Sequence, residues 1–263
     1  MKKGIARISK LIPNSLTLCN SICGFVAIVY MLQVYDPAEH KLAIFATSSW
    51  IIVFAMIFDV LDGFAARLFH AESMHGVQMD SLADMVTFGV APATICAIMA
   101  HALWKDDPWT LLIYALCAIY LGCAALRLAT YNVKAMTAQE KSKDFSGLPS
   151  PGAAAGVCSM AMLLSYFDIN YPEMKLHKFA VYIPIYAAAL GILMITPIPY
   201  PHAGKWFFSA WRNKWRVVSI LCILSIIMVF RERGLFVIIN IYIFSGPIKM
   251  LVRLFRPRRR ARA

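Results

Sequence analysis

Long apolar runs alternate with short polar segments along the whole chain. Because a membrane-spanning helix needs about 20 mainly apolar residues, each long run predicts one span. The pattern predicts about eight spans, of which the seventh is the shortest, at 15–34, 42–59, 82–104, 109–128, 151–167, 179–197, 217–230 and 235–251. We therefore expect an all-α fold, a polytopic integral membrane helical bundle.

The two ends of the chain differ from these runs. Residues 1–12 are basic and amphipathic, which predicts a short interfacial segment, and the run that follows lacks the cleavage site of a removed signal peptide. Residues 253–263 form a basic tail suited to anionic headgroups. Since no internal repeat divides the chain, we treat 1–263 as a single membrane domain. Residues 13–151 form its core helices and 152–252 its additional spans.

Composition excludes a soluble protein. The 263 residues are 60% hydrophobic and 15% charged, whereas a soluble domain carries about a quarter charged residues and cannot hide so much apolar surface. Collagen-like, disordered and disulfide-scaffold proteins are excluded as well. The seven cysteines all lie within apolar stretches, which indicates small core residues rather than disulfides or metal ligands.

Positive charge is concentrated at the chain ends and in a few loops. Lys and Arg number 26 against 14 Asp and Glu, a net charge of +12, but no basic face is interleaved with aromatic residues. This placement favours anionic membrane lipids as partners and excludes nucleic acid. By the positive-inside rule, both termini lie on the cytoplasmic side of the cell membrane, and Arg231 with Arg233 is the one exception to the charge bias.

Four aspartates lie around the polar segment between the second and third runs. Asp59 and Asp62 share one helix face, and Asp80 and Asp84 share another, so two helices meeting there would bring four carboxylates together. Ionisable groups at membrane depth are costly and need a counter-charge, and Arg67 alone is not enough. A cation channel or transporter is an alternative, but it would spread its acids across the membrane depth rather than gather them at one interface.

Hard divalent cations would supply the missing charge. Carboxylate oxygens without a His and Cys set suit Mg²⁺ or Mn²⁺, and two ions beside a phosphate ester can neutralise it for in-line attack. Gly63, Ala66 and Gly76 clear a helix face for a bulky ligand, or alternatively only pack helices.

The stretch from Asp59 to Asp84 resembles the signature of the CDP-alcohol phosphatidyltransferases, D-x2-D-G-x2-A-R followed after about eight residues by G-x3-D-x3-D, at every fixed position. The resemblance implies an integral membrane enzyme, usually a homodimer, in which an alcohol displaces CMP from a CDP-linked lipid at the cytoplasmic side. It also implies that Asp59, Asp62 and Asp80 bind the metal, and that Asp84 completes the site and acts as general base. The residues implied on the CDP-lipid side are Asp59, Gly63, Ala66, Arg67 and Gly76.

The acceptor alcohol is indicated by residues beyond this signature. Family members with a phosphorylated acceptor tend to place Lys or Arg after the last aspartate, whereas this chain has Met85. Because a thioether cannot bind a phosphate dianion, an acceptor without phosphate is favoured. The segments 13–24, 80–92, 127–132 and 145–151 resemble the phosphatidylserine synthase branch, with Thr87 where Ser is commoner. That implies CDP-diacylglycerol and L-serine as substrates; another acceptor alcohol or an archaeal-type CDP-lipid donor is the alternative.

Several polar residues are candidates for the two substrate pockets. Arg127 is a candidate for the serine carboxylate or, equally, a positive-inside anchor, and the turn 147–151 either presents Ser150 or only caps the fifth span. The serine-side candidates are Thr87, Phe88, Arg127, Asn132 and Ser150. Asn14, Thr17 and Asn20 either line the nucleotide side or form interhelical hydrogen bonds.

Overall fold

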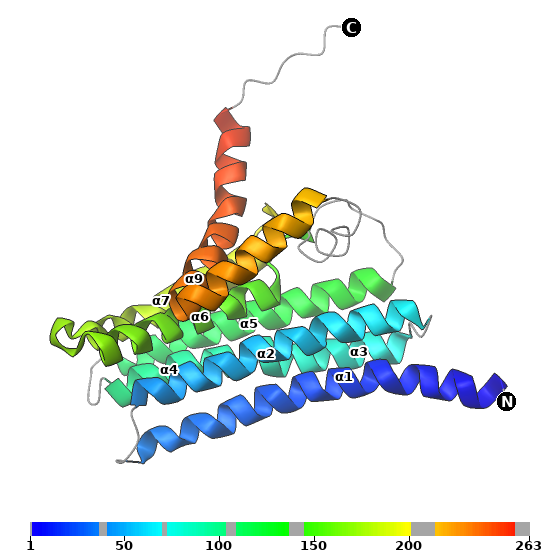
Figure 1. Cartoon of the computed structure of the whole chain (residues 1–263), viewed down its shortest axis with the longest axis horizontal. Helices are drawn as coiled ribbons and strands as arrows, with labels where there is room; N and C mark the ends of the chain where they lie inside the picture. The colour runs from blue at the N-terminus through cyan, green and yellow to red at the C-terminus, as the bar shows by residue number, and fades with distance from the viewer. Residues whose placement is uncertain are drawn as a thin grey trace, which may run out of the picture.

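A computed structural model of the chain describes residues 2–36, 41–69, 73–103, 109–136, 145–200 and 214–255. Its α-helices are α1 (Lys2–Met31), α2 (Lys41–Leu68), α3 (Met74–Asp84), α4 (Ala91–Leu103), α5 (Thr110–Met136), α6 (Ser150–Asn170), α7 (Ile183–Ile195) and α9 (Lys214–Phe255). A π-helix, η2 (Met85–Val90), joins α3 to α4. The 3-10 helices are η1 (Leu32–Tyr35), η3 (Pro172–Met174) and η4 (Leu176–Tyr182). Figure 1 shows α1, α2, α5 and the end-to-end pair α3 and α4 with their axes nearly aligned.

Within the described residues, seven helical stretches are long and apolar enough to cross a membrane. They are Leu11–Tyr35, Lys41–Leu68, Met74–Leu103, Thr110–Val133, Ser150–Asn170, Lys178–Ile195 and Ser225–Val252. The protein is therefore an integral membrane protein, and the predicted all-α polytopic bundle is confirmed.

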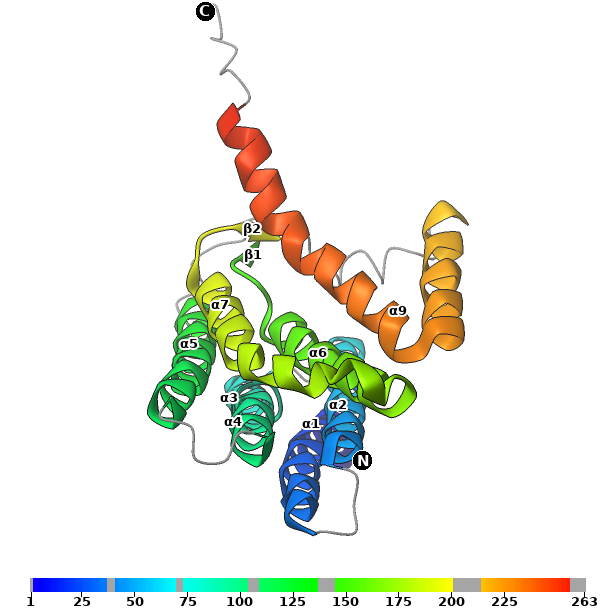
Figure 2. The same ribbon diagram turned by 90° about the vertical axis from the view of Figure 1, so that its left-hand side faces the viewer.

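The end of the bundle differs from the expected pair of spans at 217–230 and 235–251. Both ranges lie in α9, where a single stretch, Ser225–Val252, has the length and composition of a span. That stretch crosses Arg231, whose φ of 41° and ψ of −115° interrupt the helix, and the two halves of α9 turn sharply away from each other (Figure 2). The predicted boundary is thus a real bend, although seven spans are found in the described residues rather than eight.

Helices near the aspartates extend further than hydropathy indicates. The second span was expected to end at Asp59 but α2 continues to Leu68, and the third was expected from Leu82 but its helix begins at Met74. Ser73 caps α3 by accepting a hydrogen bond from the Gly76 N–H at 3.1 Å. Hydropathy falls where charged residues begin, whereas the backbone hydrogen bonds continue. Likewise, the predicted interfacial segment 1–12 is continuous with the first span, because α1 runs unbroken from Lys2.

The core is built around α6, which packs on α2, α7 and α9. Its inward residues are small and fully buried, among them Ala153, Ala154, Cys158 and Ala161. Small residues let neighbouring backbones approach closely in a membrane, where apolar burial alone does not hold helices together. Across the bundle, many exposed side chains are large and apolar, as a lipid-facing surface requires.

A two-residue antiparallel ladder connects the start of α6 to the segment after α7. The strand β1 (Phe145–Ser146) pairs with β2 (Pro199–Tyr200). Gly147 follows with φ +89°, and its N–H donates to the Ile198 carbonyl at 2.9 Å. A side chain at Gly147 would strike the Met194 carbonyl, so the crossing needs glycine. The expected turn therefore docks the beginning of α6 against the end of α7.

The crossing of α1 and η2 is equally close. We expect Gly24→Val to destabilise the fold by about 1–3 kcal/mol, because a Cβ at Gly24 would lie 2.5 Å from Thr87 Oγ1 and 2.8 Å from Thr87 Cα. Thermal unfolding of the purified protein in detergent measures the change. Gly122→Ala is the matched control, since a Cβ there meets nothing within 4 Å. Unfolding of both variants at the wild-type temperature would contradict the close crossing.

Candidate active site

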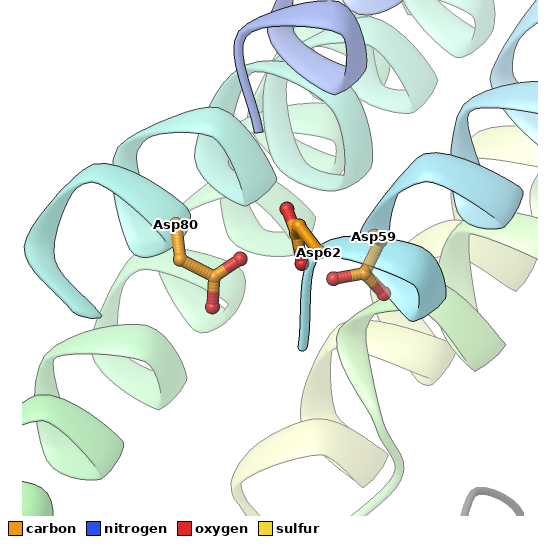
Figure 3. A group of neighbouring side chains, drawn as sticks. All are labelled: Asp59, Asp62 and Asp80. Atoms are coloured by element: carbon orange, nitrogen blue, oxygen red, sulfur yellow. The ribbon is translucent and has the colours of Figure 1, made fainter. Parts of the chain in front are cut away.

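Three aspartates from two helices converge at one end of the bundle. Asp59 and Asp62 come from the last part of α2, and Asp80 comes from α3. One carboxylate oxygen from each of the three lies within 4.8 Å of the other two (Figure 3). The spacing argument from the sequence is therefore correct, since both helix faces turn toward the same point.

Asp84 lies one turn deeper on α3. Its side chain is 9% exposed, and the Asn20 amide on α1 donates to its Oδ1 at 3.2 Å. Asp84 is also within hydrogen-bond reach of Asp59 and interacts electrostatically with Asp80 and Asp62. All four predicted carboxylates thus share one site, in which Asp62 and Asp84 are buried.

The first helix supplies polar contacts to this cluster. The Thr17 hydroxyl donates to Asp62 Oδ2 at 2.8 Å and lies 3.1 Å from the Pro13 carbonyl oxygen. Together with the bond from Asn20 to Asp84, this contact ties α1 to both acidic helices. Thr17 and Asn20 are therefore interhelical hydrogen-bond donors to the aspartates, one for each helix.

The donor set fits a hard divalent cation. Among the described residues, none of the four aspartates makes an ion pair with Lys, Arg or His, and Asp80 Oδ1 is buried without any hydrogen-bond partner. The negative charge of four neighbouring carboxylates is therefore not compensated by these residues, and one buried carboxylate oxygen has no hydrogen-bond donor. Oxygen-only ligands are those that Mg²⁺ and Mn²⁺ prefer, so these residues could hold such ions.

A cleft of about 310 Å³ opens beside the aspartates, between α1, α2 and α3. It is lined by most of the predicted nucleotide-side residues, namely Asn14, Thr17, Gly63, Ala66, Arg67 and Gly76, together with Asp62 and Asp80. Asp59 and Asn20 do not line it. The Arg67 Nε donates to the Gly63 carbonyl at 2.9 Å, which places the guanidinium at the rim.

The two glycines of the signature, Gly63 and Gly76, differ in how much free space a Cβ atom would find at each position. A Cβ at Gly63 would meet nothing within 4 Å, so this glycine is not needed for helix packing and leaves open space in the cleft. A Cβ at Gly76 would lie 3.2 Å from Ser73 Oγ, the atom that caps α3. The ligand interpretation is therefore favoured for Gly63, whereas Gly76 also protects a helix cap.

Two of the five serine-side candidates, Asn132 and Thr87, are hydrogen-bonded to residues next to or bonded to the aspartates, and a third, Arg127, interacts with Asp84 through its charge. Asn132 Oδ1 accepts a 2.7 Å hydrogen bond from Ser81, the residue after Asp80. Thr87 donates to the Asn20 carbonyl at 2.9 Å. Arg127 interacts electrostatically with Asp84.

Arg127 is also held firmly in place. It is 5% exposed, donates to the Met194 carbonyl at 3.2 Å and lies over the Tyr131 ring, 4.6 Å from the ring centroid. A buried, stacked guanidinium is unlike a snorkelling membrane anchor, which argues against the anchor interpretation.

The other two serine-side candidates, Phe88 and Ser150, are buried side chains that do not contact the aspartates through hydrogen bonds in the described part of the chain. Phe88 is fully buried, and its carbonyl accepts a 2.8 Å hydrogen bond from the Tyr120 hydroxyl. Ser150 is buried at the first residue of α6. Among the described residues, neither has a hydrogen bond to the aspartates.

One feature of the site had no sequence signal. The helix changes to π geometry at Met85, directly after Asp84, and Thr87 and Phe88 both lie within that segment. π-helical turns are rare and occur frequently at functional sites. The Tyr120 hydroxyl donates a hydrogen bond to a carbonyl of this turn. Tyr120 was not a candidate from the sequence, because this hydrogen bond joins residues far apart in the chain.

The similarity of this chain to known proteins agrees with this geometry. The family profile described as CDP-alcohol phosphatidyltransferase matches residues 10–197, well over half of the chain and all four aspartates. The chain belongs to the CDP-alcohol phosphatidyltransferase family. It is therefore a transferase, as the signature from Asp59 to Asp84 predicted.

Similar enzymes from two bacteria and a yeast each match more than half of the chain. It is 29% identical over 244 residues to a CDP-diacylglycerol–serine O-phosphatidyltransferase of Helicobacter pylori, covering 92% of this chain and 91% of the relative. An enzyme of the same name from Bacillus subtilis is 34% identical over 196 residues, covering 74% and 92%. One from Saccharomyces cerevisiae is 36% identical over 151 residues, covering 56% and 51%. These similarities agree with the predicted branch of the CDP-alcohol phosphatidyltransferase family.

Proposed function

We propose that this chain transfers the phosphatidyl group of CDP-diacylglycerol to the hydroxyl of L-serine and releases CMP. The observation that carries the proposal is the meeting of Asp59, Asp62, Asp80 and Asp84 beside an open cleft. The names of the relatives and Met85, which follows Asp84 where a phosphate-binding cation would otherwise stand, support serine as the acceptor.

In this proposal, Asp59, Asp62 and Asp80 would hold two Mg²⁺ or Mn²⁺ ions, and Asp84 would complete the site. When bound, the ions supply positive charge that neutralises the pyrophosphate oxygens and the leaving CMP. Thr17 orients the Asp62 carboxylate through their 2.8 Å hydrogen bond. Asn14, Gly63, Ala66, Arg67 and Gly76 hold the CDP-lipid in the cleft, in which Gly63 leaves room for it.

The chemical step needs one base. Asp84 accepts the proton of the serine hydroxyl as the serine oxygen forms its bond to phosphorus, and the bond from phosphorus to the CMP oxygen breaks. Asn20 keeps one Asp84 oxygen engaged at 3.2 Å, so the other oxygen takes the proton. Most of the rate enhancement then comes from positioning and charge neutralisation.

The serine pocket is proposed around the residues that adjoin Asp84. Arg127 binds the serine carboxylate, since it is a buried cation that interacts with Asp84. Thr87 and Asn132 complete the polar wall, each already bonded to a neighbour of an aspartate. Phe88 and Ser150 belong to the second layer of this pocket, through the η2 backbone and the start of α6.

We also propose an orientation of the chain in the membrane and its binding partners. Both termini and the carboxylate cleft face the cytoplasm, in the cell membrane, and the single domain 1–263 forms a homodimer among anionic lipids. Part of the basic loop at 134–143, most of that at 205–216 and the tail at 256–262 lie outside the described residues. The positive-inside bias of the sequence supports the orientation.

An acceptor panel tests this function. Purified protein with CDP-diacylglycerol is expected to release CMP with serine and Mg²⁺, but not with glycerol 3-phosphate, inositol phosphate or choline. An ether-linked archaeal-type CDP-lipid in place of CDP-diacylglycerol tests the donor. CMP release with another acceptor but not serine would overturn the assignment. Metal-dependent ion flux without CMP would instead support a channel.

A further inference from the structure

A second cleft, of about 430 Å³, lies at the opposite end of α2 from the aspartates. Its lining residues come from the beginning of α2, the end of α6 and the bend of α9, three elements that lie near one another in Figure 2. At 1.5 Å per residue, Ala46 in its wall lies about 24 Å along α2 from Asp62. The two clefts therefore lie near opposite ends of a helix that is long enough to span a membrane.

Three consecutive charged residues stand at the bend of α9 in this cleft. Arg231 has a φ of 41°, which non-glycine residues rarely adopt, so the bend holds the charges at some cost in backbone strain. Arg231 Nη2 lies 3.5 Å from Glu232 Oε1, and the Glu232 side chain is only 15% exposed. Because Glu232 offsets one arginine, the group carries a net charge of +1.

Arg233 is held by rings rather than by an acid. Its guanidinium carbon lies 4.6 Å from the centroid of the Tyr166 ring and 5.9 Å from that of Phe230. Within the described ranges, it makes no hydrogen bond or ion pair. Aromatic rings bind the flat face of a guanidinium and leave its N–H edge for an anion. Arg233 is thus a positioned donor with its donor edge unused.

The surroundings point to a lipid rather than a soluble anion. Trp50 and Tyr166 line the cleft, and such side chains are typical of the membrane interface. Beside it, Met228 is 81% and Val229 70% exposed, a surface that acyl chains would cover. A phospholipid phosphodiester carries one negative charge, which matches the net +1 of the bend.

We propose that this cleft binds the phosphodiester headgroup of a glycerophospholipid in the leaflet opposite the carboxylate cleft. Arg233 donates to the phosphate oxygens, Arg231 adds the second cation, and Glu232 sets the net charge. This site explains the one pair of arginines that departs from the positive-inside bias, since a local anion compensates them. It does not depend on which alcohol the carboxylate site uses.

Lipid retention in native mass spectrometry tests the site. The full chain, released from detergent, is titrated with phosphatidylglycerol and with diacylglycerol of the same acyl chains. Asp62→Asn serves as the background, so that the carboxylate cleft does not dominate the signal. We expect Arg233→Gln to weaken phosphatidylglycerol retention about tenfold through loss of a charge-assisted hydrogen bond, with diacylglycerol retained weakly by both proteins.

A substitution of opposite sign separates headgroup binding from a structural role. Glu232→Gln raises the net charge of the bend, so it should strengthen phosphatidylglycerol retention. If the three charged residues only stabilised the fold, both Arg233→Gln and Glu232→Gln should weaken retention. Lys175→Gln is the matched control, since Lys175 is an exposed cation outside the cleft and should have no effect.

Three results would overturn the site. They are unchanged retention in Arg233→Gln, diacylglycerol retained as well as phosphatidylglycerol, and displacement of the lipid by inorganic phosphate at equal concentration. The last result would indicate a soluble anion instead.

Discussion

Replacing Asp84 by asparagine is expected to lower the rate of CMP release roughly a thousandfold, because a general base contributes a factor of that order. Asparagine has the same shape and keeps an oxygen for the Asn20 amide, which now lies 3.2 Å from Asp84 Oδ1. It cannot take the serine proton. Binding of CDP-diacylglycerol should change little, since Asp84 does not line the cleft. Single-turnover CMP formation and equilibrium binding of the CDP-lipid measure the two effects separately.

A matched control uses another aspartate of the same chain. Asp168 lies near the far end of α6, so Asp168→Asn should leave the rate of CMP release at the wild-type level. Near-normal turnover in Asp84→Asn would rule out this residue as the base. Loss of CDP-lipid binding along with turnover would show that its role is to hold the site together.

Substitutions in the metal cluster should give a graded loss of Mn²⁺ binding. Asp62→Asn and Asp80→Asn each remove a charged ligand, and we expect them to weaken binding by more than about a hundredfold and to abolish turnover. Thr17→Val removes only the 2.8 Å hydrogen bond to Asp62, and an outer-shell partner of this kind is worth about 10- to 100-fold in metal affinity. Electron paramagnetic resonance of free Mn²⁺ measures the affinities.

Thr47→Val is the control for that series. Its hydroxyl bonds to the Ala43 carbonyl at the other end of α2, so Mn²⁺ affinity should match that of the wild type. Chelation of divalent ions should abolish CMP release, and added Mg²⁺ should restore it. Full activity after chelation would contradict the metal proposal, and equal Mn²⁺ affinity in Thr17→Val and wild type would remove Thr17 from it.

The acidic site could be predicted from sequence because its information is local. Aspartates three or four residues apart must share a helix face, and their presence in apolar sequence already requires a common polar environment. What the sequence alone did not indicate was how far the helices run around them. Hydropathy ends at the first charges, whereas α2 and α3 continue through the charged residues to Leu68 and from Met74.

Arg127 and Asn132 were candidates from the sequence, but the contacts that position them could not be predicted, because they join distant segments. Ser81 meets Asn132 across α3 and α5, and Arg127 meets the Met194 carbonyl across α5 and α7. No periodicity within either segment encodes such a pairing. The bend at Arg231 was foreseen as a boundary between spans, but its unusual backbone angles and its cleft required the folded chain.

The π-helix at Met85–Val90 also sets how α4 is rotated relative to α3. The Ala91 N–H bonds to the Val86 carbonyl, five residues back, so the turn holds one residue more than an α-helical turn. If the same residues were wound as an ordinary α-helix, α4 would be rotated by about 100° relative to α3. Ile95, Cys96 and Met99, now fully buried, would swing toward lipid while the aspartates stayed in place. Substitutions that abolish the π geometry should therefore disturb the core more than removal of one residue of the wide turn.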